Sequence, residues 1–226
     1  MRYMKKLISA LLLATICVAV YTQEENLKKR NYFRIGLSLP TWRYFGWDDR
    51  SDWNDSYKRI GGMFEAGTFY MLNGLKLPDN MRLGINVDYM SVTYHRFDDT
   101  DTDFSNHFLF LGSKVGPSFS YNPVNQLVLD AYFKLNPVWA SSCLILYNDD
   151  NLDDRVFAGF FGIKYSVGMN IRYSFVMLGF EYNPGAVRLK EYDTDEDKFT
   201  DNYLGNTNAG DRTPVPGFNI TLGCSF

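Results

Sequence analysis

The sequence predicts an all-β chain that folds into an eight-stranded antiparallel up-and-down transmembrane β-barrel. Three observations lead to this fold class. Segments of period-two alternation recur along the chain, the connections between them are alternately short and long, and the last segment, 217–226, alternates without a break and ends on Phe226. No stretch after residue 22 reaches about 18 consecutive apolar residues, so helical membrane spans are not expected.

The first 22 residues are typical of a signal peptide. Arg2, Lys5 and Lys6 form a positive region, and an apolar region follows at 7–20. This apolar region is shorter than the ~20 residues that a membrane-spanning helix needs. We therefore expect residues 1–22 to be a signal peptide and residues 23–226 to form a single barrel domain.

Charge excludes one class of partner. The predicted signal peptide contains three of the 23 basic residues and none of the 26 acidic ones, so residues 23–226 carry 20 basic against 26 acidic residues and a net charge of −6. A nucleic-acid partner would require a basic face, so no nucleic-acid partner is expected.

Each predicted strand has one apolar face and one polar face. In the first segment Phe33, Ile35 and Leu37 alternate with Arg34 and Gly36. The same pattern recurs seven more times, and most segments approach or exceed the ~9–11 residues of a tilted transmembrane strand. The predicted strands cover residues 33–39, 63–72, 81–89, 109–121, 127–136, 161–171, 176–182 and 217–226.

The connections sort into two kinds. Short connections are expected at 73–80, 122–126 and 172–174, and long ones at 43–60, 98–105, 141–155 and 191–214. The four long connections hold 19 of the 26 acidic residues, which suits segments exposed to water. Short turns on one side and long loops on the other match the periplasmic and extracellular ends of an outer-membrane barrel. An even number of strands then places both termini on the periplasmic side.

The polar faces are predicted to line the inside of the barrel. A water-soluble lipocalin-type barrel is the alternative, and it would turn its apolar face inward. Here the polar face repeats glycine, serine and asparagine and carries charges of both signs, which could pair inside a barrel that side chains just fill. The predicted lumen charges are Arg34, Glu65, Arg82, Asp88, Lys114, Asp130, Lys134, Lys164 and Glu181.

On these features the chain resembles the small eight-stranded outer-membrane barrels of the OmpX and OmpA-barrel type, and the outer-membrane β-barrel or "porin family" proteins of Bacteroidetes. The resemblance implies an integral protein of a Gram-negative outer membrane, surrounded by its lipids. It also implies that the terminal strand, with Phe218 and Phe226, is presented to the barrel insertion machinery. A lumen plugged by its own side chains is expected for a barrel of this size.

The first long connection is rich in aromatic residues. Trp42, Trp47 and Trp53 would favour contact with a partner protein or glycan, or would pack together to cap the barrel. The preferred hypothesis is a non-enzymatic barrel that acts through its acidic, aromatic extracellular loops, in envelope structure, in adhesion or as a subunit of an outer-membrane assembly. No cofactor is expected.

Two other functions stay open. An outer-membrane enzyme acting on lipid A or peptides could use His95 and His107, which flank the second long connection near Ser91, Asp98 and Ser105. Both histidines, however, have the alternation of the lipid-facing set, so no catalytic residue is assigned. A narrow channel for small solutes is the other alternative.

The acidic tip of the second long connection is a weak candidate for metal binding. Asp99, Asp101 and Asp103 alternate as calcium ligands do, but Phe104 and Phe110 stand where an EF-hand loop has glycine and glutamate. No metal site is assigned.

Overall fold

The computed structural model describes residues 30–41, 57–72, 74–99, 104–124, 126–148, 151–188, 190–193, 198–200 and 213–226. The predicted signal peptide lies outside these residues, as do Trp42, Trp47 and Trp53. No helix in the described ranges is long and apolar enough to cross a membrane.

The described residues form a single antiparallel sheet of twelve strands. Their bounds are β1 Arg30–Pro40, β2 Tyr57–Met71, β3 Met81–Asp99, β4 Phe104–Val124, β5 Leu127–Asn148, β6 Asn151–Tyr173, β7 Val176–Asn183, β8 Gly185–Val187, β9 Glu191–Asp193, β10 Lys198–Thr200, β11 Thr213–Pro214 and β12 Gly217–Ser225.

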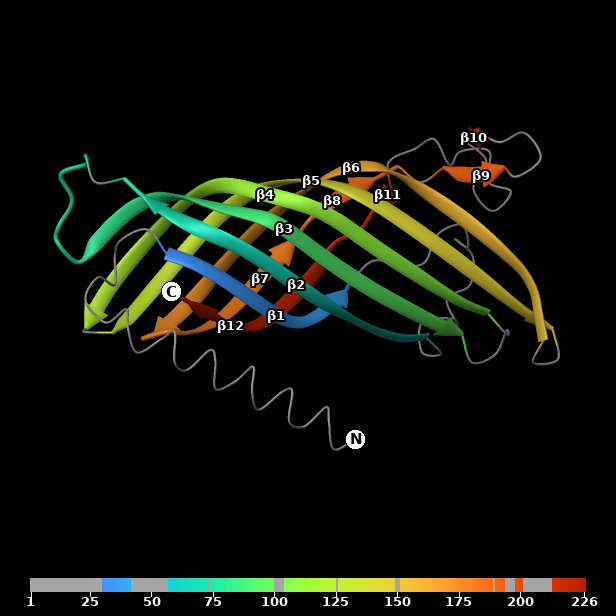
Figure 1. The fold of residues 1–226 in the computed structure, drawn as a ribbon, viewed down its shortest axis with the longest axis horizontal. Helices are drawn as coiled ribbons and strands as arrows, with labels where there is room; N and C mark the ends of the chain where they lie inside the picture. The colour runs from blue at the N-terminus through green and yellow to red at the C-terminus, as the bar shows by residue number, and fades with distance from the viewer. Residues whose placement is uncertain are drawn as a thin grey trace, which may run out of the picture.

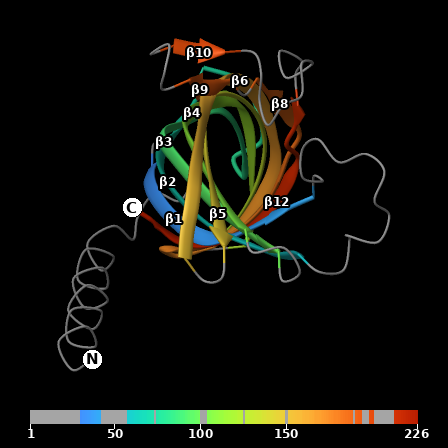
Figure 2. The same ribbon diagram turned by 90° about the vertical axis from the view of Figure 1, so that its right-hand side faces the viewer.

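The sheet closes into a barrel, seen from the side in Figure 1 and towards one end in Figure 2. Strands β1 to β6 each pair with the next strand along the chain, and β12 pairs with both β7 and β1. Eight strands therefore form the wall, with β8 extending the line of β7 along β6. This closed barrel is the predicted fold class, and it is the fold that the resemblance to small outer-membrane barrels implied.

The short connections and the final residue gather at one end of the barrel (Figure 1). Gln126 and Ser174 lie in two-residue connections and adopt positive φ angles of 68° and 55°. At the same end Asn31 and Phe226 exchange two backbone hydrogen bonds, which join the start of β1 to the end of the chain. We call this the Phe226 end.

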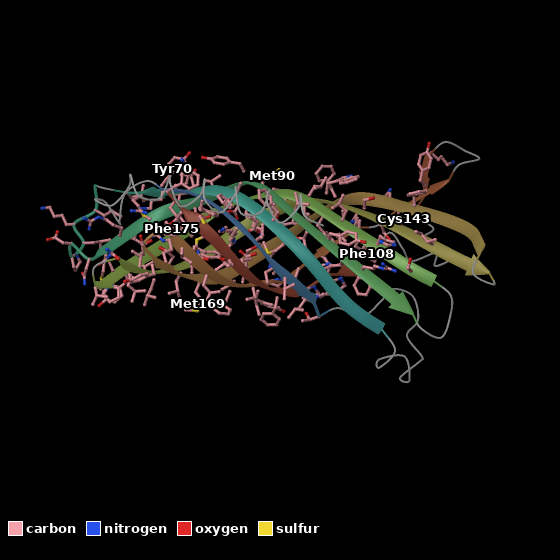
Figure 3. All side chains as sticks on the ribbon, turned by 60° about the horizontal axis from the view of Figure 1, so that its bottom comes forward. Tyr70, Met90, Phe108, Cys143, Met169 and Phe175 are labelled. Atoms are coloured by element: carbon pink, nitrogen blue, oxygen red, sulfur yellow. The ribbon has the colours of Figure 1, made fainter. Side chains whose placement is uncertain are left out.

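The alternation predicted from the sequence sets the two faces of the wall. In β12 the side chains of Phe218, Ile220 and Leu222 are exposed, whereas those of Asn219 and Thr221 are buried. Every strand of the wall contributes to an exposed apolar belt, and Figure 3 shows Tyr70 and Met169 on the outer surface. The belt includes Ile35, Leu37, Tyr70, Leu83, Ile85, Leu111, Val115, Phe119, Phe133, Leu135, Phe161, Ile163, Val167, Met169, Phe180, Phe218, Ile220 and Leu222.

A β-bulge in β3 changes which residues face inward. Asp88 pairs with Lys114 of β4, and the next pair is Ser91 with Gly112, so Tyr89 and Met90 oppose a single residue. The extra residue reverses the alternation beyond it. As a result His95 faces the lumen and is buried, and its predicted place on the lipid-facing side is wrong.

Strands β3 to β6 are longer than predicted. They contain 19 to 23 residues, about twice the ~9–11 that cross a membrane. The long connection expected at 141–155 is wrong, because β5 continues to Asn148 and β6 begins at Asn151. Figure 1 shows β5 and β6 running on past β1, β7 and β12 at the end opposite Phe226.

Candidate functional site

The lumen is lined with charged side chains brought from every part of the wall. Eight of the nine residues proposed from the sequence are buried inside: Arg34, Glu65, Asp88, Lys114, Asp130, Lys134, Lys164 and Glu181. Arg82 is different, because it lies near the Phe226 end and donates hydrogen bonds to the backbone carbonyls of Pro78 and Met81. It takes no part in the ion pairs described below.

Arg34 on β1 is the centre of the charged network. Its Nε donates to Glu65 Oε2 at 2.5 Å, and its Nη2 donates to Glu181 Oε2 at 2.8 Å. Its Nη1 donates to the hydroxyl of Tyr132 at 2.9 Å and to Asn170 Oδ1 at 3.1 Å. One planar guanidinium thus connects four other strands across the lumen, a geometry that a lysine could not reproduce.

Lys114 on β4 joins Arg34, Glu65 and Glu181 in a group of four charges, which we call the central cluster. Its ammonium donates to Glu181 Oε1 at 2.5 Å and also forms an ion pair with Glu65. Two cations and two carboxylates therefore alternate, and each carboxylate contacts both cations. A buried carboxylate is tolerated when it has this many charged hydrogen-bond partners.

Two further ion pairs lie in the lumen. Lys134 donates to Asp88 Oδ2 at 2.7 Å, and the Tyr32 hydroxyl is hydrogen-bonded to Asp88 as well. Arg172 donates two hydrogen bonds to the Asp130 carboxylate, from Nε to Oδ2 at 2.6 Å and from Nη2 to Oδ1 at 2.8 Å. Such bidentate pairs fix geometry as well as charge.

Sequence reasoning missed several members of this network. Arg172 falls in a predicted short connection, although it is the next inward residue after Asn170 in the alternation of 161–171. Tyr132 and Asn170 have the inward alternation too, but they are uncharged and are absent from the predicted set of lumen charges. Following the alternation to the last residue of each strand, for polar residues as well as charged ones, would have found all three.

Apolar side chains are buried in the lumen on both sides of the four charges formed by Arg34, Glu65, Lys114 and Glu181. Beyond them, at the end opposite Phe226, a buried cluster contains Phe97, Phe108, Phe110, Val138, Ala140, Ala158, Val187 and Val215, and we call it the outer plug. Towards the Phe226 end Tyr32, Phe69 and Met177 pack together, with the Arg172 guanidinium 5.0 Å from the centre of the Phe69 ring. Tyr32, Phe69, Met177 and the members of the outer plug are all at most 5% exposed.

The two histidines do not form one site. His95 lies inside, where its Nε2 is 2.8 Å from Ser38 Oγ. Because Ser38 donates its single proton to Asn219 Oδ1, His95 Nε2 is the donor in that contact. His107 lies on the outer surface, where its Nδ1 is 2.6 Å from the Tyr94 hydroxyl.

A small cavity lies between the central cluster and the outer plug. Its volume is about 10 Å³, roughly the space of one water molecule. Ser38, His95, Lys114, Asn136, Lys164 and Asn219 contribute to its walls. We call it the lysine cavity. Within the described residues no group of three or more histidine, cysteine or acidic side chains could hold a metal ion.

The remaining proposed site residues lie on the outer surface or outside the described residues. Phe218 and Phe226 are exposed on the outer surface of the barrel. The aromatic residues Trp42, Trp47 and Trp53 fall in the part of the chain that the structure does not describe, so their proposed partner contacts stay a prediction. Trp139 on β5 is exposed on the outer surface.

No protein-family model matches the sequence, and no curated protein sequence matches it. Among solved structures, the fold is similar to that of Ail, the attachment invasion locus protein of Yersinia pestis, with 12% identity, a TM-score of 0.49, and coverage of 88% of this chain and 99% of that chain. It is also similar to the outer membrane protease OmpT from Escherichia coli, with 12% identity, a TM-score of 0.47, and coverage of 89% and 97%. A major outer membrane protein from Thermus thermophilus gives 12% identity, a TM-score of 0.48, and coverage of 88% and 98%. At such identities the likeness concerns the fold alone.

Proposed function

We propose that this chain is an integral outer-membrane barrel with a closed lumen, and that it acts through the end of the wall opposite Phe226. The observation that carries the proposal is the division of side chains between the two faces of the wall. The outer face presents an apolar belt on all eight wall strands, whereas the inner face buries ten charged side chains, Arg30 and Arg172 among them. A soluble ligand-binding barrel would have the opposite arrangement.

The filled lumen favours a structural or binding role over a channel. The outer plug and the apolar group of Tyr32, Phe69 and Met177 lie on either side of the central cluster. The lysine cavity between them holds about one water molecule, far less than a solute path requires. Function is therefore assigned to the surface and not to transport through the barrel.

The catalytic alternative receives little support from the histidines. His95 and His107 are turned to opposite faces of the wall, so they cannot act on one substrate together. We retain the non-enzymatic proposal, with the Phe226 end in the periplasm and the extended ends of β3 to β6 outside the cell. Lipids and the barrel insertion machinery are the partners that this location implies.

Membrane integration is tested by placing arginine on the apolar belt. Ile220→Arg is expected to lower the free energy of unfolding by about 2 kcal/mol, since arginine in the lipid-facing band of such a barrel costs about 2–4 kcal/mol at the midplane. Urea unfolding of the barrel refolded into lipid vesicles measures the loss.

Leu75→Arg is the matched control. Leu75 is 49% exposed and Ile220 is 42% exposed, but Leu75 lies in the connection between β2 and β3 and not on the belt. In a water-soluble protein both substitutions would change stability by less than about 0.5 kcal/mol. Equal, small effects of the two variants would contradict the membrane location.

Action through the outer end is tested at the three tryptophans of the first long connection. Replacing Trp42, Trp47 and Trp53 with serine is expected to leave the amount of folded protein in the outer membrane unchanged, while a partner that co-purifies in constant ratio with the unaltered protein is lost. Large exposed aromatic side chains carry much of the energy in such contacts. Purification from the native membrane in mild detergent measures both quantities. Retention of the partner by the triple variant would contradict the assignment.

A further inference from the structure

We propose that the lysine cavity is a binding site for a small monatomic anion of the chloride class, held by the ammonium group of Lys164. The inference goes beyond the proposed function, because it concerns an internal ligand and not the outer surface. Two independent observations carry it. One is the charge balance of the lumen, and the other is the polar wall of the cavity.

The charge balance leaves Lys164 as a cation without a carboxylate. Each of the four buried carboxylates is already engaged: Glu65 and Glu181 with Arg34 and Lys114, Asp88 with Lys134, and Asp130 with Arg172. The Lys164 side chain is only 6% exposed, and no carboxylate of the described residues lies within ion-pair distance of its ammonium. The ammonium lies over the Phe110 ring, 4.9 Å from the ring centre.

An uncompensated ammonium in this position is energetically costly. The loss of hydration of an ion is only partly offset when its surroundings relax, and contact with the face of one aromatic ring offsets only a further part. An anion in the cavity would provide the missing opposite charge. Lys114 also lines the cavity, but its charge is already balanced by Glu65 and Glu181, so the uncompensated charge there is that of Lys164.

The cavity wall has the chemistry that such an ion needs. Asn136 lines the cavity and is 5% exposed. Its side-chain amide carries an NH₂ group, a hydrogen-bond donor of the kind that an anion requires. The volume of about 10 Å³ has room for a single water molecule. Chloride is somewhat larger than water, so it is accommodated by small side-chain movements, whereas a carboxylate or phosphate needs several times this space.

The experiment compares thermal unfolding in chloride and in gluconate, an anion too large for the cavity. The full chain is folded in detergent micelles, and the temperature at which the folded band disappears on a gel is recorded at equal ionic strength. Chloride is expected to raise this midpoint by about 3–6 °C for each tenfold increase above the dissociation constant. The Lys164→Met variant should lose this dependence and should unfold in gluconate at or above the temperature of the unaltered protein.

Lys134→Met is the matched control. It removes the lumen lysine that has a single carboxylate partner, so it should lower the midpoint in both salts and keep the response to chloride. Bromide soaked into crystals should give an anomalous scattering peak next to the Lys164 ammonium. An unaltered protein that unfolds at the same temperature in chloride and gluconate would overturn the proposal and indicate a water-filled cavity. An equal chloride response in Lys164→Met would overturn it as well, because the ion would then bind elsewhere.

Discussion

Replacing Arg34 with methionine is expected to lower the free energy of unfolding by about 3–5 kcal/mol, the usual cost of removing one partner of a buried ion pair. Arg34 is 1% exposed and donates to both Glu65 and Glu181. Without it, the two carboxylates would share Lys114 alone and would repel each other in a medium of low dielectric constant. Urea unfolding of the refolded barrel in vesicles, followed by tryptophan fluorescence, measures the loss.

Two further variants make this prediction specific. Arg82→Met removes an arginine of the same wall whose side chain contacts only backbone carbonyls in the described structure, so its effect should stay within about 0.5 kcal/mol. Adding Glu181→Gln to Arg34→Met removes the excess negative charge and should restore part of the stability, since Glu65 and Lys114 then remain as a pair. Equal losses in Arg34→Met and Arg82→Met would mean that the central cluster does not stabilise the barrel.

Replacing Gly116 with valine is expected to lower the free energy of unfolding by at least about 3 kcal/mol, at the upper end of the range for overpacked interiors. A Cβ atom at Gly116 would lie 1.9 Å from the backbone oxygen of Phe133 and 2.7 Å from the Cα of Lys134. Both atoms belong to the backbone of β5, so the clash can be relieved only by separating β4 from β5. The fraction of refolded protein that migrates as a folded band measures the effect.

Gly62→Val is the matched control for Gly116→Val. Gly62 lies in β2, and a Cβ atom there would meet nothing closer than the Gly36 oxygen at 4.0 Å. The side chain would point outward, where β-branched residues suit a strand. We therefore expect Gly62→Val to refold as well as the unaltered chain. Normal folding of Gly116→Val would show that β4 and β5 do not approach each other as closely as in this structure.

The sequence predicted the faces of the wall better than the ends of its strands. Alternation of apolar and polar residues depends only on neighbours along one strand, so the inward placement of Arg34, Lys114 and Glu181 follows from local pattern. Strand length depends on pairing with other strands. The polar run at 148–154 (NDDNLDD) resembles a loop in composition. Pairing of β5 with β4 up to Leu146, and with β6 up to Asn148 and Asn151, keeps the ends of these strands in the sheet.

The inward or outward direction of residues beyond the β3 bulge could not be predicted from the alternation. Nothing in the local pattern around Tyr89 and Met90 signals an extra residue, yet it decides whether His95 faces lipid or lumen. A bulge is set by the fit of one strand against two neighbours. That fit exists only in the closed sheet.

The sequence by itself determined the number of wall strands, the apolar belt and most of the charges that fill the lumen, because each follows from short-range periodicity. The tertiary structure alone decided which charges meet. Arg34 and Glu181 are 147 positions apart and come together because closure of the barrel brings β1 and β7 across the same lumen. The same closure leaves Lys164 beside a cavity and not beside a carboxylate, since ion pairing in a narrow barrel depends on the relative heights of residues on different strands.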